Sequence, residues 1–232
     1  MADKKQFPGI PNPFRGIFFA FEGMDGNGKT EQIKRTVAWL RQLTIGRRQP
    51  VVAEVKEPGR DRNVGATIYR DLEGRGANFH TDNLSAFQKW YALDSRENMV
   101  KNILRRLEVG SIVIADRYRP SLVYGARGPE EIGDLVLINQ IIMGEHFIWP
   151  DAILIFDVSE ETAIERLKKK GRNLDGHEQR AVLERVRENY KFFAMTYANC
   201  CLIDGEGPPE QVFEEVRGII GPIVEKRYRP QV

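Results

Sequence analysis

A glycine-rich segment near the amino terminus has the residue types of a phosphate-binding loop. It runs from Gly23 to Thr30 and reads G-M-D-G-N-G-K-T, which matches the pattern G-x-x-x-x-G-K-[ST]. Its glycines let backbone N–H groups turn toward phosphate oxygens, and the start of the following helix favours anions. We expect Lys29 to bridge the β- and γ-phosphates of a nucleotide and the Thr30 hydroxyl to hold Mg²⁺. The loop residues expected at the nucleotide are Gly23, Asp25, Gly26, Asn27, Gly28, Lys29 and Thr30.

An acidic residue at the end of a later apolar run could assist the metal ion. Ile112–Ala115 is apolar, and Asp116 follows it directly. Ligands of open α/β sheets bind at the carboxyl ends of the strands, so Asp116 could steer Mg²⁺ through water. The structural alternative is that Asp116 caps the following loop. Asp157 closes another apolar run in the same way, and we rank it lower because no basic residue follows it.

The residue after Asp116 indicates the class of reaction. GTPases need an N-K-x-D motif to read guanine, and the chain has none. Motor ATPases usually place a second acid after the strand-end aspartate to activate water, whereas Arg117 stands here. An arginine suits an anionic acceptor better than a hydrolytic water, so the predicted chemistry is phosphoryl transfer to a phosphate.

Short apolar runs alternate with longer helical patterns from Ile17 onward. The predicted strands are Ile17–Phe21, Val51–Val55, Ile112–Ala115, Ala152–Phe156 and Cys201–Ile203. The predicted helices are Thr30–Leu43, Leu84–Glu108 and Ala181–Ala198, with a further helix start at Pro208–Glu210. This alternation predicts an α/β fold in which helices cover both faces of a parallel sheet. Because no composition break marks a linker, we expect one domain over residues 16–232, preceded by an extended, proline-containing arm over residues 1–15.

Composition and charge exclude several other classes of protein. The 232 residues include 35 Lys+Arg and 33 Asp+Glu, a net charge of +2, which argues against coating a nucleic acid polymer or an anionic membrane. No apolar run approaches the roughly 20 residues that span a bilayer, and no apolar stretch follows the first residues as in a signal peptide. Cys200 and Cys201 are adjacent and lack metal-ligand spacing, so we expect a reduced, cytoplasmic protein.

Four motifs taken together resemble the thymidylate kinase family of nucleoside monophosphate kinases. The motifs are Phe21–Thr30, Glu57–Gly59, Asp116–Tyr118 with Ser121, and the run from Pro150 to Asp157 followed by Glu165–Leu167. Their order, from about Ile17 to Val216, is much more specific than the phosphate loop by itself. The resemblance implies a P-loop NTPase fold with a five-stranded parallel sheet. It also implies a homodimer that transfers the γ-phosphoryl group of ATP to dTMP with Mg²⁺.

The resemblance also implies which residues hold the acceptor. By position, Asp25 approaches its sugar and phosphate, and Arg117 holds its phosphate. A second arginine downstream of the Glu-Pro-Gly turn is expected to do likewise; Arg70 fits best and Arg60 is the fallback, although either could be a solvated charge. Tyr91 is expected to stack on the base. The residues expected at the acceptor are Asp25, Glu57, Pro58, Arg70, Tyr91, Arg96, Arg117, Ser121 and Tyr124.

The segment from about 166 to 180 is strongly basic and is expected to form a mobile lid. Six cations face two anions there, which suits closure over ATP phosphates and exclusion of water. An arginine that arrives late can stabilise the charge of a phosphoryl transition state. Arg172 is the preferred catalytic cation, with Arg166 and Lys170 behind it, and His177 is expected to be a neutral surface residue. The predicted catalytic set is thus Lys29, Asp25, Arg117 and Arg172, and Arg166 also contacts ATP.

Three positions depart from the family pattern. The family typically has an arginine four residues after the aromatic that stacks on the base; Ser95 stands there and Arg96 comes one residue, or 100° of helix, later. The family's aromatic residue near the deoxyribose is Gly125 here, with Tyr124 one place early, and an arginine of the lid is Gly176. The transfer machinery is intact, whereas the base pocket differs.

Two further functions therefore stay open. The first is a kinase that acts on a different nucleoside monophosphate or on a nucleoside. The second is a nucleotide-binding regulator that has lost catalysis, against which the intact Lys29, Thr30, Asp116 and Arg117 argue. A nucleic-acid motor is disfavoured, because the chain is one small domain without a second catalytic acid.

Overall fold

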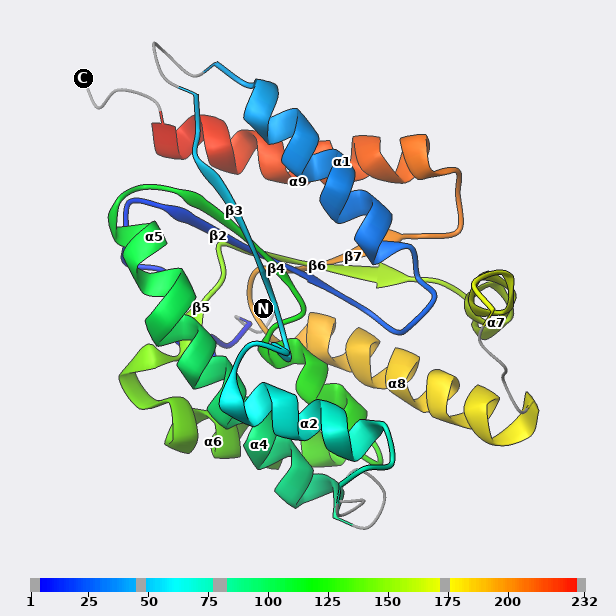
Figure 1. Ribbon diagram of the computed structural model, residues 1–232. Coiled ribbons are helices and arrows are strands. Elements are labelled where there is room, and N and C mark those ends of the chain that lie inside the picture. Colours follow the sequence, from blue (N-terminus) through cyan, green and yellow to red (C-terminus); the bar gives the residue numbers. More distant parts are fainter. Residues whose placement is uncertain (1–4, 45–48, 77–82, 172–175, 229–232) are drawn as a thin grey trace.

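Five parallel strands form the main sheet of the protein (Figure 1). In the computed structural model, which describes residues 5–44, 49–76, 83–171 and 176–228, its spatial order is β3-β4-β2-β6-β7. The strands are β2 (Ile17–Glu22), β3 (Val52–Lys56), β4 (Ile112–Asp116), β6 (Ala152–Asp157) and β7 (Cys200–Asp204). Every neighbouring pair is parallel. The predicted α/β fold with a five-stranded parallel sheet is confirmed, and each predicted strand lies within one residue of its expected bounds.

Helices cover both faces of this sheet (Figure 1). On one face lie α1 (Lys29–Gln42) and α9 (Pro209–Tyr228). The helices on the other face are α2 (Asn63–Leu72), α4 (Leu84–Asn98), α5 (Leu104–Glu108), α6 (Ile132–Met143) and α8 (Gly176–Thr196). The short helix α7 (Glu160–Lys169) follows β6. Minor elements are β1 (Ile10–Pro11), β5 (Ile148–Trp149), η2 (Arg119–Gly125), η3 (Pro129–Glu131) and η4 (Gly144–His146).

The central strand β2 explains why two helical layers form. All six of its residues are buried, and successive side chains of a strand point to opposite faces. Phe18 and Ala20 pack in the cluster with α5, α6 and α8, whereas Phe19 and Phe21 pack in the cluster with α1 and α9. An apolar run without polar alternation is therefore buried on both sides, as a strand of a parallel sheet must be.

The predicted helix over Leu84–Glu108 is interrupted. Its middle is a π-helix, η1 (Met99–Ile103), in which the Leu104 N–H donates to the Met99 carbonyl five residues back. A π turn inserts one residue into the helical register, and such turns are frequent at functional sites. The residues on either side of η1 consequently face neighbours that an uninterrupted α-helix would not give them.

The first described residues run along the body of the protein. Gln6 exchanges backbone hydrogen bonds with Thr196 and Ala198, at 3.2 and 2.8 Å, and β1 pairs in parallel with β5. No helix in the described part of the chain is both long and apolar enough to cross a membrane. Because all five strands of the main sheet are parallel, their carboxyl ends meet at one edge. Glu22, Lys56, Asp116 and Asp157 end four of the strands there.

Candidate active site

The loop between β2 and α1 has the backbone of a phosphate cradle. Gly23, Gly26 and Gly28 all have positive φ angles, of 127°, 86° and 88°, which favour glycine over residues with a side chain. A Cβ at Gly26 would lie 2.5 Å from the Ala163 carbonyl oxygen, and one at Gly23 would lie 2.6 Å from that of Phe156. The loop therefore needs glycine for its shape and its close contacts, and it leads directly into the N-terminus of α1.

The side chain of Asn27 holds this loop closed. It is buried, and its amide donates to the carbonyl oxygens of Glu22 and Phe156 at 3.2 and 3.3 Å. Its Oδ1 accepts from the Lys29 N–H at 3.0 Å. Asn27 thus shapes the cradle with its side chain, and its contribution to a nucleotide must come from its backbone.

Lys29 and Asp116 form an ion pair at the mouth of the cradle. Their Nζ and Oδ1 atoms are 2.5 Å apart, and both side chains are largely buried. Burial lowers the pKa of Lys29, and Arg117 lowers it further, although Asp116 opposes both. Burial works to raise the pKa of Asp116, but Lys29 and Arg117 outweigh it and hold that pKa below its usual value. The strand-end carboxylate and the loop lysine therefore form a close ion pair where phosphates and a metal ion would bind.

The donor set fits Mg²⁺ held jointly with a nucleotide. Thr30, exposed in the first turn of α1, and Asp116 supply the hard oxygen ligands that Mg²⁺ prefers, and they line one cavity with Lys29 and Lys170. Within the described residues no cluster of three or more histidine, cysteine or acidic side chains could hold a metal ion. A bound Mg²⁺ would consequently need phosphate oxygens and water for the rest of its coordination shell.

Arg117 and Asp25, which come from different loops, are brought together beside the cradle. The Arg117 Nη2 atom is 2.6 Å from Asp25 Oδ1, and its Nη1 atom donates to the Gly23 carbonyl at 3.1 Å. Nη2 also reaches the Tyr124 hydroxyl at 3.3 Å, and the guanidinium lies 5.1 Å from the centre of that ring. Arg117 has a φ of 70°, a strained value for a residue with a side chain. Burial works to lower the pKa of Arg117, but its tyrosine and acidic neighbours raise it well above its usual value, so a cation is fixed at the mouth of the loop.

A buried carboxylate supports the turn that carries Arg117. Glu22 accepts hydrogen bonds from the Tyr118 N–H at 2.6 Å and from the hydroxyls of Ser121 and Tyr190, both at 2.8 Å. Burial raises the pKa of Glu22 despite these bonds. Neither Glu22 nor Tyr190 was among the predicted site residues. The available signal was one acidic residue at the end of an otherwise apolar strand.

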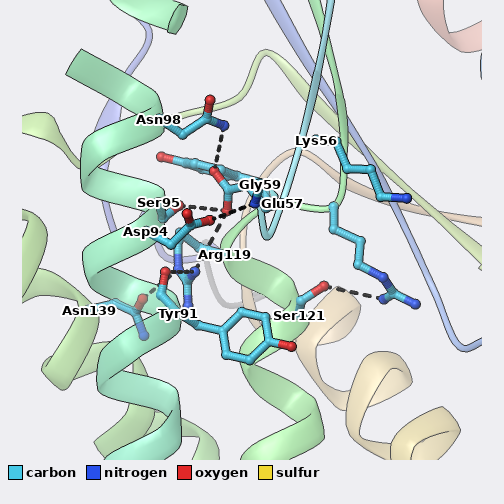
Figure 2. A network of polar contacts seen from close by, with 12 residues as sticks. Lys56, Glu57, Gly59, Tyr91, Asp94, Ser95, Asn98, Arg119, Ser121 and Asn139 are labelled. Carbon is cyan, nitrogen blue, oxygen red and sulfur yellow. Dashed lines mark hydrogen bonds and ion pairs between the residues drawn. The ribbon is translucent and has the colours of Figure 1, made fainter. Parts of the chain in front are cut away.

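A second buried network joins the Glu57–Pro58 turn to α4, as Figure 2 shows. Glu57 accepts from the Ser95 hydroxyl at 2.7 Å and from the Asn98 amide at 3.1 Å, and Arg119 Nη1 lies 3.7 Å from its Oε2. Burial raises the pKa of Glu57 to about 7. The carboxylate of Glu57, a predicted acceptor residue, is therefore hydrogen-bonded to side chains of α4. Pro58 beside it is buried as well.

Arg62 extends the same network and was missed by sequence reasoning. Its guanidinium forms a two-pronged ion pair with Asp94, Nε to Oδ1 and Nη2 to Oδ2 both at 2.8 Å, and donates to Asn98 at 3.1 Å. Both side chains of the pair are at most 5% exposed. The pair ties the segment after β3 to α4.

Three predicted acceptor residues lie at the surface. Arg70 is exposed on α2 and donates to Thr67, and Arg60 stacks on the Tyr69 ring at 3.8 Å and pairs with Glu73. Arg96 is exposed on α4, directly after the buried Ser95. One residue of a helix turns by 100°, and this turn separates Arg96 from the inward direction that Ser95 takes.

The remaining predicted aromatic residues lie nearer the cradle. Tyr91 is partly exposed on α4, and burial raises its pKa. Tyr124 and Ser121 both contact Arg117, the latter at 3.4 Å. Tyr91 thus lies on α4, whereas Ser121 and Tyr124 lie on η2, the turn that follows β4.

The first residues of the predicted lid segment lie against the cradle. Arg166 donates to the carbonyl oxygens of Asn27, Gly205 and Glu206 at 3.4, 3.0 and 3.4 Å. Lys170 lines the same cavity as Lys29. The predicted catalytic cation Arg172 lies outside the described residues, as does the side chain of His177.

The second strand-end acid, Asp157, has a structural partner. Arg187 of α8 donates two hydrogen bonds to it, from Nε to Oδ1 at 2.6 Å and from Nη2 to Oδ2 at 3.0 Å. The same guanidinium lies 3.5 Å from Glu160 at the start of α7. Asp157 therefore links β6 to α7 and α8, while Asp116 faces the cradle.

Comparison with known proteins identifies the family. The family model described as thymidylate kinase matches residues 21–216. A protein named thymidylate kinase from Caldicellulosiruptor saccharolyticus is 32% identical over 217 residues, covering 92% of this chain and 100% of that protein. Another of that name, from Thermosipho melanesiensis, is 29% identical over 205 residues, covering 88% of this chain and 97% of its own length. The loop, the Lys29–Asp116 pair and the Arg117–Asp25 pair lie within the matched range, and the chain belongs to the thymidylate kinase family.

Proposed function

We propose that this protein transfers the γ-phosphoryl group of ATP to dTMP, giving ADP and dTDP, with Mg²⁺. The observation that carries the proposal is the position of Arg117. Its guanidinium lies beside the phosphate cradle, on Asp25 and on the Gly23 carbonyl. A cation held there can bind the phosphate of an acceptor next to the γ-phosphate of a donor, which a hydrolase would not need.

On the donor side, the backbone N–H groups of the cradle and Lys29 bind the ATP phosphates. Thr30 and Asp116 hold Mg²⁺, which neutralises phosphate charge when it is bound. Lys29 is paired with Asp116 at 2.5 Å, so the incoming phosphates meet a lysine that Asp116 has already positioned. Arg166 donates to the carbonyl oxygens of Asn27 and Gly205 beside the loop, which supports its proposed contact with ATP.

On the acceptor side, Arg117 holds the dTMP phosphate and Asp25 orients the guanidinium. An acceptor phosphate already carries nucleophilic oxygen, so the site needs no strong general base. Tyr91 supplies an aromatic face for the base, and Arg172 of the lid supplies the cation that meets the transition state. Catalysis then depends on holding the two substrates in position and on cations that are in place before the phosphoryl group moves.

A second acceptor is favoured by one observation. Ser95 donates its hydroxyl to Glu57, and Arg96 is exposed, so neither side chain offers a cation to a base stacked on Tyr91. Another pyrimidine nucleoside monophosphate, such as dUMP, is therefore the second candidate.

A panel of nucleoside monophosphates tests the proposal. With ATP and Mg²⁺, we expect dTMP among the best acceptors and ADP formation that requires the acceptor. Lys29→Ala should lower kcat by at least about a hundredfold, since it removes a charge aimed at the phosphates. Lys34→Ala, an exposed lysine on the same helix, is the matched control and should retain activity. Turnover without an acceptor, or unchanged activity in Lys29→Ala, would refute the proposed function.

A homodimer is part of the same proposal. Leu137 and Ile141 stand one turn apart on α6 and are 53% and 73% exposed, and Leu93 on the neighbouring α4 is 43% exposed. Adjacent exposed apolar side chains of this kind typically mark a protein interface. We also propose that the enzyme acts in the cytoplasm as a small-molecule kinase, which agrees with its two free cysteines and near-neutral charge.

A further inference from the structure

Among the described residues, two buried polar atoms near Tyr91 have no hydrogen-bond partner. They are Oε1 of Gln88 and Nη2 of Arg119, whose residues are 3% and 1% exposed. A buried polar group without a partner is costly, and in native proteins it usually meets a ligand or a water molecule. Both side chains lie in the seam between α4 and η2, next to the residues that surround Arg117.

The Arg119 guanidinium is held from three sides. Its Nε donates to Asn139 Oδ1 at 2.5 Å, its Nη1 donates to the Tyr91 carbonyl at 3.0 Å, and the same Nη1 lies 3.7 Å from Glu57. Figure 2 shows the guanidinium among Tyr91, Glu57 and Asn139. Ser95 and Arg119 approach the same oxygen of Glu57, so this cation stands on the inward side of α4, where Ser95 offers only a hydroxyl.

Gln88 reaches the seam from one helical turn before Tyr91. Residues three apart share a helix face, so the two side chains are neighbours on α4. Gln88 packs on Gly125, the last residue of η2: a Cβ at that position would lie 2.4 Å from Gln88 Cγ and 2.8 Å from its Nε2. Glycine at position 125 thus leaves the room that the Gln88 amide fills.

One of the two atoms is a donor and the other an acceptor, and Arg119 and Gln88 are both neighbours of Tyr91 on the seam between α4 and η2. Arginine can only donate, and an amide oxygen can only accept. The edge of a uracil-type base presents O4 as an acceptor and N3–H as a donor, whereas cytosine carries an amino group at position 4. We propose that Arg119 and Gln88 recognise the base of the acceptor, with Arg119 Nη2 donating to O4 and Gln88 Oε1 accepting from N3–H while Tyr91 stacks on the ring. This proposal rests on the proposed function and names the residues that choose a 4-keto pyrimidine.

Selectivity between acceptors tests this assignment. We expect the wild type to prefer dTMP and dUMP over dCMP by at least about a hundredfold in kcat/KM. Arg119→Met and Gln88→Met should each reduce that ratio by about tenfold or more, because each removes one base contact. A structural role would lower kcat/KM for all acceptors by the same factor, and a ratio unchanged in both variants would overturn the proposal.

A modified substrate isolates the Gln88 contact. N3-methyl-dTMP lacks the N3–H donor, so wild-type kcat/KM should fall at least about tenfold relative to dTMP. Gln88→Met should show almost no further difference between the two substrates. Equal discrimination by the wild type and Gln88→Met would contradict the contact.

Substitutions at two glycines, one beside Gln88 and one distant control, test the same contact without changing Arg119 or Gln88. Gly125→Ala should displace Gln88 and reproduce the loss of selectivity, whereas Gly133→Ala on α6, with no heavy atom within 4 Å of the new Cβ, should leave the ratio unchanged. These variants also serve if Arg119→Met does not fold. A wild-type enzyme that phosphorylates no nucleoside monophosphate overturns the proposed function and this inference together. Normal dTMP turnover with unaltered ratios in all variants overturns this inference only.

Discussion

Replacing Glu57 with glutamine should change how the stability of the protein depends on pH. Glu57 is 3% exposed, and burial raises its pKa from 4.5 to about 7 even though Arg119, Ser95 and Asn98 all favour the charged form. The folded state therefore holds a proton that the unfolded state has already released between pH 4.5 and pH 7. Over this window the free energy of unfolding of the wild type falls as the pH rises, by about 3 kcal/mol from this group.

Urea unfolding of both proteins at pH 5 and pH 8 measures the effect. Glu57→Gln keeps the size of the side chain and cannot titrate, so the other groups largely cancel in the difference between the two proteins. We expect the variant to gain about 2 to 3 kcal/mol relative to the wild type between the two pH values. A difference that stays constant with pH, or a wild type that gains on the variant as the pH rises, would refute the reasoning about the buried carboxyl group.

Two further predictions concern the cradle and the assembly. Gly26→Ala places a Cβ 2.5 Å from the Ala163 carbonyl oxygen at a φ of 86°, so the KM for ATP should rise at least about tenfold in steady-state assays. Gly218→Ala is the control, because its new Cβ meets no atom within 4 Å. Equal KM values for the two variants would contradict the close contact at Gly26. Ile141→Glu puts a charge on the exposed apolar part of α6, so light scattering should show a monomer at concentrations where the wild type is a dimer; a variant that remains dimeric places the interface elsewhere.

The fold and the donor side could be predicted from the sequence because their signals are local. The phosphate loop needs three glycines within six residues, and buried parallel strands appear as short apolar runs. Parallel strands end at one edge of the sheet, and β4 pairs directly with β2, so Asp116 lies beside the loop that carries Lys29. The 2.5 Å pair between these two residues is the geometric result of that topology.

The acceptor side depends on contacts between distant residues, which carry no local signal. Arg62 and Asp94 are 32 residues apart, and each looks like an ordinary surface charge in the sequence. Arg119 follows the recognised Asp116–Tyr118 motif, yet its burial depends on Asn139 of α6 and on Glu57. Sequence spacing makes Arg96 a candidate for contact with the base. The packing of α4 decides the direction of its side chain, and it buries Ser95 and exposes Arg96.

Phosphorus NMR of a reaction with ATP, Mg²⁺ and dTMP tests the central claim most directly, because it identifies the group that receives the phosphoryl. A site with Arg117 and Asp25 beside the cradle predicts that dTDP appears in step with ADP and that inorganic phosphate stays at the background level. Release of inorganic phosphate with dTMP unchanged would mean that water is the acceptor, and would contradict the role assigned to Arg117.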